Sequence, residues 1–347
     1  MSRNATKDLT TGSPMKLILG FGIPLLFGML FQQFYNMMDT IIVGKFLGVS
    51  ALASVGATGS INFMIIGFCM GVCNGFAIPV AQRFGAKDEH GMRKFVANSV
   101  WLSIIFAVVM AVLVCVFCRQ ILELMNTPED IIDGSYSYIF VIFLGIPATY
   151  MYNLLSGIMR SLGDSKTPLY LLIFSSILNI ILDLLSIIVL KMGVAGAAWA
   201  TVIAQAVSGF CCLGVIWKKF PILHVQREEW QPDKLCILNL CNMGIPMGLQ
   251  YSITAIGSVI IQAAVNSLGS VAVASVAAAV KINMFLCCPY DAMGSTMATY
   301  AGQNVGAGKF DRLKQGEKSC TLLGLVYGIA AFIFILLFGK YLALLFV

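Results

Sequence analysis

Three acidic residues, Asp39, Asp183 and Asp291, lie inside long apolar stretches of this 347-residue chain. A carboxylate in a lipid-embedded segment is costly unless it is solvated, paired or protonated, so such residues usually belong to ion or substrate pathways. Asn179 precedes Asp183 by one helical turn, which places both side chains on one helix face. Carboxylate and amide oxygens suit Na⁺, and a buried carboxylate also serves as a proton site.

The depth of these residues below the membrane surface can be counted along their helices. At a helical rise of about 1.5 Å per residue, Asp183 lies about 12 Å from the end of its apolar stretch, and Thr201 about 10 Å deep in the next one. Asp39 lies about 8 Å deep by the same count. The sequence therefore predicts a cation site for Na⁺ or H⁺ at Asp39, Asn179, Asp183 and Thr201. The alternative is that Asp39 caps a helix end, while Asn179 and Asp183 join helices by hydrogen bonds.

A second group of residues predicts a substrate cavity. Asp291 and Lys281 share one apolar stretch but are ten residues apart, so they need not pair. Lys281 either neutralises a cavity carboxylate or extends to the membrane surface. Methionine and aromatic side chains suit promiscuous binding, although at helical spacing they also serve as packing. The cavity candidates are Tyr35, Met38, Lys281 and Asp291, with Phe31, Met37, Met151 and Tyr152 as further lining residues.

The elements that must position these residues are membrane spans. The chain is 59% hydrophobic and 11% charged, which leaves too little polar surface to cover a soluble globule. A span needs about 20 mostly apolar residues. Nine stretches meet this condition, so we expect an all-α integral membrane protein with spans at about 17–43, 51–80, 95–118, 136–159, 168–190, 194–217, 236–266, 271–300 and 319–339.

The distribution of basic residues predicts the orientation of these spans. Seventeen Lys and Arg residues fall in one set of alternate loops and four in the other. Because basic residues collect on the cytoplasmic side, this asymmetry places the N-terminus in the cytoplasm. The same residues explain the net charge of +6; they are spread over separate loops without a recognisable binding motif, so no nucleic-acid partner is expected.

The chain lacks the patterns of an enzyme. It has no HExxH or GxSxG sequence, and Gly306-Ala307-Gly308-Lys309 has neither the spacing nor the Ser or Thr of a phosphate-binding loop. Most of the 11 cysteines lie in apolar stretches, where Cys acts as a small hydrophobic residue. We therefore expect no enzyme activity, no cofactor and no structural metal, and the only ion implied is a coupling Na⁺ or H⁺.

The chain also repeats itself at an offset of about 221 residues. Gly22-Ile23-Pro24 returns as Gly244-Ile245-Pro246, and Gly85-Ala86 as Gly306-Ala307. Homologous halves in a membrane chain are typical of secondary transporters, whose binding site lies between the halves. We expect an N-lobe with spans one to six at 1–218, a linker at 219–235 whose length lets the lobes rock, and a partial C-lobe with spans seven to nine at 236–347. Pro24 and Pro246 are predicted hinges.

These residues together resemble the multidrug and toxic compound extrusion (MATE) family, in its DinF-like branch. The resemblance runs the whole chain and is carried by Gly22-Ile23-Pro24, Tyr35–Asp39, Arg160–Pro168, Asn179–Asp183 and Gly193–Thr201. It implies a V-shaped bundle of two pseudo-symmetric six-helix lobes in the plasma or inner membrane, monomeric when complete. In that branch, Asp39, Asn179, Asp183 and Thr201 match the cation-binding positions. Leu184 stands where many relatives have proline, and the absence of that proline would straighten this span.

The resemblance implies export of cationic or amphipathic compounds in exchange for Na⁺ or H⁺. Family members have twelve helices, and the repeat offset places the end of a complete second half near residue 440, so the expectation is a C-terminally truncated chain with nine of the twelve. Two alternatives remain open: a flippase for lipid-linked oligosaccharides, which would need a more cationic cavity, and a non-transporting fragment.

Overall fold

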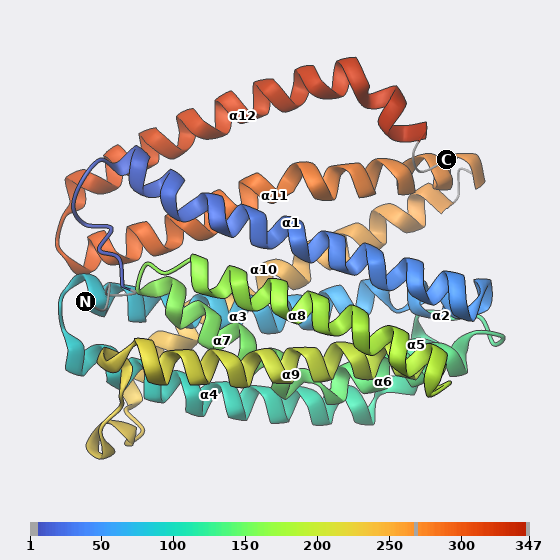
Figure 1. Cartoon of the computed structure of the whole chain (residues 1–347), viewed down its shortest axis with the longest axis horizontal. Coiled ribbons are helices and arrows are strands. Elements are labelled where there is room, and N and C mark those ends of the chain that lie inside the picture. The colour runs from blue at the N-terminus through green and yellow to red at the C-terminus, as the bar shows by residue number, and fades with distance from the viewer. Residues whose placement is uncertain (1–5, 267–269, 345–347) are drawn as a thin grey trace.

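The computed structural model describes residues 6–266 and 270–344, and the regular structure in these ranges is helical. Figure 1 shows the long helices running side by side, with α1 between α11 and α8. In chain order the α-helices are α1 (Pro14–Leu47), α2 (Val49–Ala57), α3 (Gly59–Gly85), α4 (Glu89–Val116), α5 (Cys118–Leu124), α6 (Ile132–Leu144), α7 (Ile146–Ser161), α8 (Lys166–Leu184), α9 (Val194–Lys219), α10 (Lys234–Asn266), α11 (Ser270–Gly306) and α12 (Phe310–Leu344). Three short helical segments are η1 (Leu185–Val189), η2 (Pro221–Leu223) and η3 (Arg227–Trp230).

The helices confirm an all-helical membrane protein with small corrections to the spans. Seven helices in the described part are long and apolar enough to cross a membrane, and the pair α6 and α7, bent by 46°, makes an eighth. The predicted span 271–300 lies in α11, several of whose side chains fall outside the described part of the structure, so this span stays a prediction. The spans predicted at 51–80 and 136–159 are each two helices rather than one. Pro147, in the first turn of α7, explains the second break because its ring cannot continue a preceding helix.

The internal repeat is visible in the positions of the helices. The segment α2–α3 covers 49–85 and α11 covers 270–306, so both ends are offset by 221 residues, and α4 and α12 begin at 89 and 310. The copies differ at Thr58, whose hydroxyl donates to the Val55 carbonyl at 2.7 Å and interrupts the first copy. Such a bond gives the backbone an alternative to the helix ladder. The repeat is therefore structural as well as sequential.

Glycines bring the two lobes together along α3 and α10. Gly71 and Gly75 on α3 face Gly244 and Gly248 on α10, and a Cβ at Gly71 or Gly75 would meet the α10 backbone within 2.5 Å. Pairs of small residues four positions apart let helix backbones approach closely in membranes. The α10 helix consequently makes its most extensive contacts with α3, across the lobe boundary, while α1 contacts α11 and α12.

The lobes also meet at the end of the bundle that holds the N-terminal segment and the basic turns after α3, α7 and α11, here called the basic end. A Cβ at Gly85 would collide with the Gln303 carbonyl, and one at Gly306 with the Gln82 carbonyl. These two contacts exchange under the 221-residue offset. The α3 and α11 ends thus form a pseudo-symmetric crossing that only glycine permits.

Residues 7–12, the N-terminal strap, cover this crossing. The Lys7 amide donates to the Leu162 carbonyl at 2.9 Å, and the Leu9 amide donates to Gln303 Oε1 at 2.8 Å. The Gln303 amide in turn donates to the Ser161 carbonyl at 2.8 Å. Leu9 itself is buried beside Phe21 and other apolar side chains. The strap therefore joins the α7 end of the N-lobe to the α11 end of the C-lobe.

The linker between the lobes, residues 219–235, makes specific contacts with α4. Glu229 is buried and receives hydrogen bonds from the Arg93 guanidinium at 2.9 Å, with its other partner His90 at 2.8 Å. The Trp101 indole donates to the Trp230 carbonyl at 3.1 Å, and the Asp233 amide donates to Asn98 Oδ1 at 2.9 Å. These contacts fix the later part of the linker to α4 of the N-lobe, and the prediction that its length lets the lobes rock stays a prediction.

Candidate cation site and central cavity

The buried polar residues of α8 form one side of a polar cluster in the N-lobe. Asp183 is fully buried and Asn179, one turn earlier, is nearly so. The α-helix ends at Leu184 and continues as the π-helix η1. The absence of proline at Leu184 was expected to straighten the span, but the chain widens into a π turn at this point. Such turns inside helices are frequent at functional sites.

Asp39 from α1 completes the carboxyl pair. Its side chain lies at hydrogen-bonding distance from that of Asp183, although the two residues belong to different helices. Two carboxylates this close repel each other strongly unless a proton or another cation lies between them. The pair therefore forms a built position for one positive charge between α1 and α8.

A chain of hydrogen bonds supports this pair. Tyr35 Oη donates to Thr201 Oγ1 at 3.4 Å. The Asn179 amide satisfies its neighbours when its oxygen accepts from the Thr201 amide at 3.2 Å and from Thr201 Oγ1 at 3.3 Å, and its nitrogen donates to Asp183 Oδ2 at 3.1 Å. Donors and acceptors then point in one direction toward the carboxyl pair. The four residues predicted from depth thus lie in one cluster, with Tyr35 added to it.

The donor set fits a small hard cation. Asp39 Oδ1 and Asp183 Oδ1 are both buried without a hydrogen-bond partner. Buried carboxylate oxygens are seldom left unpaired. Oxygen ligands of this kind suit Na⁺, and a proton shared between the carboxyls would satisfy one of them. Among the described residues, no group of three or more His, Cys, Asp or Glu side chains could hold a metal ion.

Tyr138 is a member of this cluster that the sequence analysis missed. It lies on α6, is buried, and interacts electrostatically with Asp39, Asp183 and Tyr35. Its sequence signal was weak, because a tyrosine in an apolar helix is most often packing. A deliberate search for tyrosines at the predicted depth of Asp183 could have found it.

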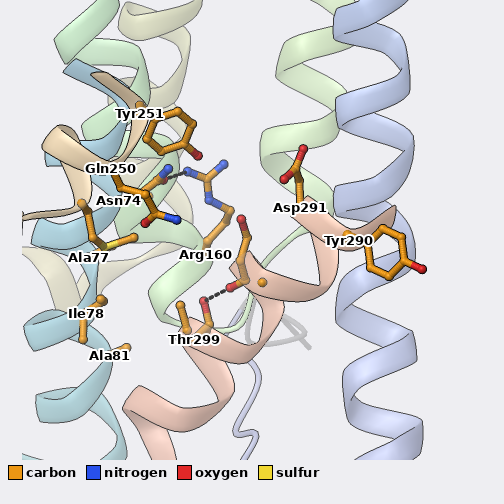
Figure 2. Close-up of a pocket in the computed structure, with 15 residues that line it drawn as sticks. Asn74, Ala77, Ile78, Ala81, Arg160, Gln250, Tyr251, Tyr290, Asp291 and Thr299 are labelled. Atoms are coloured by element: carbon orange, nitrogen blue, oxygen red, sulfur yellow. Dashed lines mark hydrogen bonds between the residues drawn. The ribbon is translucent and has the colours of Figure 1, made fainter. Parts of the chain in front are cut away.

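A cavity of about 280 Å³ lies between the lobes, lined by α3, α7, α10 and α11 (Figure 2). The Arg160 guanidinium, in the last turn of α7, points into it and donates to Asn74 Oδ1 at 3.0 Å. Tyr251 of α10 lies at hydrogen-bonding distance from Asn74. Asp291 of α11 lines the opposite wall, as predicted for a cavity carboxylate. The cavity thus presents one fixed cation and one fixed anion.

A second cavity, of about 150 Å³, connects this region with the cation site. It shares Asn74, Arg160 and Tyr251 with the first cavity, and it is also lined by Tyr35 and Asn179. Gln205 of α9, which also lines it, carries a buried oxygen without a partner. The second cavity therefore extends from the cavity between the lobes to Tyr35 and Asn179 of the cation cluster.

Arg160, Asn74 and Tyr251 were missed as cavity residues by the sequence analysis. Arg160 was assigned to a basic loop because the predicted span ended at 159, whereas α7 continues to Ser161. Asn74 and Tyr251 were readable as polar groups deep in predicted spans. The signal was present, but only the fold brings Arg160 to their level.

Other predicted residues have different placements. Met38 is exposed and lines neither of these two cavities, and its role in substrate binding stays a prediction. Tyr35 lines the second cavity, on the path to the cation site. The Lys281 side chain lies outside the described part of the structure. Pro24 and Pro246 lie within α1 and α10, and their role as hinges stays a prediction.

This architecture and its internal repeat match those of a known protein family. The MatE family model matches residues 24–185 and 246–347, so its two segments begin at the repeat-related prolines. The chain is 31% identical to the probable multidrug resistance protein YoeA of Bacillus subtilis (strain 168), over 92% of this chain and 70% of that protein. It is 29% identical to the probable multidrug resistance protein YpnP of the same organism, over 98% of this chain and 76% of that one.

A solved structure shares the fold. It is described as the outward-facing conformation of a multidrug resistance MATE family transporter of the MOP superfamily, and it matches with a TM-score of 0.90 at 25% identity, covering 97% of this chain and 75% of that one. The family match covers well over half of the sequence. This chain therefore belongs to the MatE family of membrane transporters.

Proposed function

We propose that this protein is a secondary antiporter that exports cationic or amphipathic compounds in exchange for Na⁺ or H⁺, with its basic end in the cytoplasm. The observation that carries the proposal is the carboxyl pair of Asp39 and Asp183, which joins two helices and keeps a buried, unpaired oxygen on each side chain. The names of the relatives as multidrug resistance proteins support the substrate class.

The position of α1 explains how a cation could be coupled to the substrate. This helix carries Asp39 to the pair with Asp183 on α8, and it also packs against α11 and α12 of the C-lobe. A bound cation holds α1 on α8, whereas two bare carboxylates push the helices apart. Because α1 lines the second cavity through Pro24 and Tyr35, its movement changes the space available to substrate.

The lipid-linked oligosaccharide flippase receives less support. That function would need a strongly cationic cavity to hold a pyrophosphate group, since such groups are bound by clustered basic side chains. Among the described residues, Arg160 is the basic side chain of the cavity between the lobes, and Asp291 stands opposite it. One guanidinium offset by one carboxylate suits a small amphiphile better than a diphosphate.

Transport in proteoliposomes tests the coupling and separates the ions. Purified protein is reconstituted with a fluorescent cationic drug, and its efflux is followed under an inward Na⁺ gradient at fixed pH, or under a pH gradient without Na⁺. We expect one of the two gradients to accelerate efflux. Efflux that ignores both gradients would contradict antiport. The same vesicles with Asp130→Asn, an exposed acid outside the cluster, serve as the control.

A further inference from the structure

The guanidinium of Arg160 is partly buried in the cavity wall and has no counterion among the described residues. It donates a hydrogen bond to Asn74 Oδ1, and the groups that interact with it electrostatically are Tyr152, Tyr251, Cys73 and Cys212. These side chains are neutral in their usual forms, and within the described part of the chain no carboxylate lies within 4.0 Å of Arg160. A guanidinium has five donors, so several of them face the cavity.

An unpaired buried charge is costly, and proteins rarely keep one without a partner. A Cβ at Gly157 of α7 would make ordinary contacts with Ala77 and the Cys73 carbonyl and would lie 3.8 Å from the guanidinium. Packing alone does not require arginine at this point, because its apolar stem could be replaced by methionine or leucine. The planar donor fork is instead the group that binds carboxylate and phosphate through two parallel hydrogen bonds.

Asp291 adds a second, opposite charge at a distance. It lines the same cavity from α11, is exposed to it, and interacts with Tyr251, which also interacts with Arg160. Tyr251 lies beside Arg160, with Asp291 across the cavity from both (Figure 2), and among the described residues the two charges do not form an ion pair with each other. Opposite charges held apart on facing walls complement a ligand that carries both an anionic and a cationic group.

We propose that the cavity between the lobes recognises zwitterionic amphiphiles, with Arg160 binding the carboxylate or phosphate of the ligand and Asp291 its ammonium group. This inference rests on the proposed export function and specifies its substrate class. The apolar and aromatic wall residues, such as Ile78 and Met247, would contact the scaffold between the two charges.

A matched pair of probes tests the inference. Rhodamine 110 carries a free carboxylate beside its cationic ring system, and rhodamine 123 is its methyl ester. Binding to purified protein in lipid nanodiscs is measured by fluorescence anisotropy, without any ion gradient. A charge-assisted hydrogen bond corresponds to about tenfold or more in affinity. We therefore expect the wild type to bind rhodamine 110 about tenfold more tightly than rhodamine 123.

The variants separate recognition from folding. Arg160→Gln should abolish the preference while leaving the Kd for rhodamine 123 within about twofold, and Arg160→Lys should retain part of it. Asp291→Asn should weaken both probes alike, since both carry the cation. Lys314→Gln, an exposed change outside the cavity, should alter nothing. Equal wild-type affinities, no binding of rhodamine 110, or a preference that survives Arg160→Gln would overturn the inference.

This readout is independent of coupling. A tenfold preference in nanodiscs together with efflux that ignores ion gradients would reject the proposed antiport and leave the zwitterion site standing. Gradient-driven efflux of a cationic drug by a protein that binds both rhodamines equally would support antiport and reject the zwitterion site.

Discussion

Asp183 is the residue on which the proposed coupling depends most directly. Asp183→Asn keeps the shape and the hydrogen bond to Asn179 but removes the charge that a cation must balance. We expect coupled efflux in proteoliposomes to fall about tenfold or more, the factor that about 1.4 kcal/mol represents, while the protein still inserts and elutes as the wild type does. Unchanged drug efflux by this variant, with Asp130→Asn as the matched control, would refute the assignment.

At the same scale, the sequence allowed the cation cluster to be predicted because its residues are rare. A carboxylate in an apolar helix stands out, and the depth count placed Asp183 level with Thr201 and Asp39 somewhat nearer the surface; in the structure these side chains and that of Asn179 lie in one cluster. Arg160 could not be placed in this way. A shift of one helical turn in the end of this helix decides whether Arg160 lies in a loop or in the cavity. Hydropathy does not place the end of a span that closely.

Among the helices, the crossing of α3 and α11 depends on two glycines. Gly85 and Gly306 permit α3 and α11 to cross, and a methyl group at either would meet a backbone carbonyl of the other helix. Overpacking of this kind costs about 1–3 kcal/mol. We expect Gly85→Ala and Gly306→Ala each to lower the Tm in detergent, and by similar amounts because the contacts are repeat-related. Gly257→Ala, where a Cβ would meet nothing, is the control. A Tm as high as that of Gly257→Ala in either crossing variant would argue against a tight crossing.

The sequence repeat predicted these equivalent helices but not how they cross. Glycines four residues apart on α3 and α10 are visible in the sequence, yet many membrane helices contain such pairs without using them. The breaks at Thr58 and Gly145 were also missed, because each depends on one hydrogen bond or one proline within a stretch that is apolar throughout. The π turn after Leu184 has no sequence signature that distinguishes it from a straight helix.

In the whole molecule, the segment between the lobes is held against α4 by Glu229 and its hydrogen-bond partners, a contact here called the linker clamp. Burial disfavours a charged Glu229, but the hydrogen bonds from the Gln226 amide, Arg93 and His90 outweigh it and lower the pKa of Glu229 below its ordinary value. The stabilisation is then fully present above the pKa of an unfolded glutamate, about 4.3, and is lost as the pH falls through the lower folded value.

This clamp predicts a pH-dependent difference between two variants. Glu229→Gln should lower stability by about 1–3 kcal/mol near neutral pH, since it removes the buried carboxylate that Arg93 and His90 share. Its Tm deficit relative to wild type should shrink as the pH falls below the unfolded pKa of about 4.3 and through the lower pKa of folded Glu229, where the wild-type carboxylate itself becomes protonated. Glu228→Gln, its exposed neighbour, should show no deficit. A deficit of constant size between pH 7 and strongly acidic buffer would mean that the carboxylate charge does not stabilise the clamp.

The N-terminal strap acts across the same boundary from the other side. Leu9 is buried between the lobes, and the backbone of residues 7–12 bonds to the α7 end, to Gln303 and to the α12 residues Arg312 and, just before that helix, Lys309. Leu9→Asp removes an apolar contact worth about 1.5–3 kcal/mol and places a carboxylate in its position. We expect a lower Tm and faster access of substrate from the basic end, measured as uptake into inside-out vesicles. Thr11→Asp adds the same charge at an exposed position of the strap and should change neither. Equal behaviour of the two variants would mean that the strap lies on the closed lobes without holding them together.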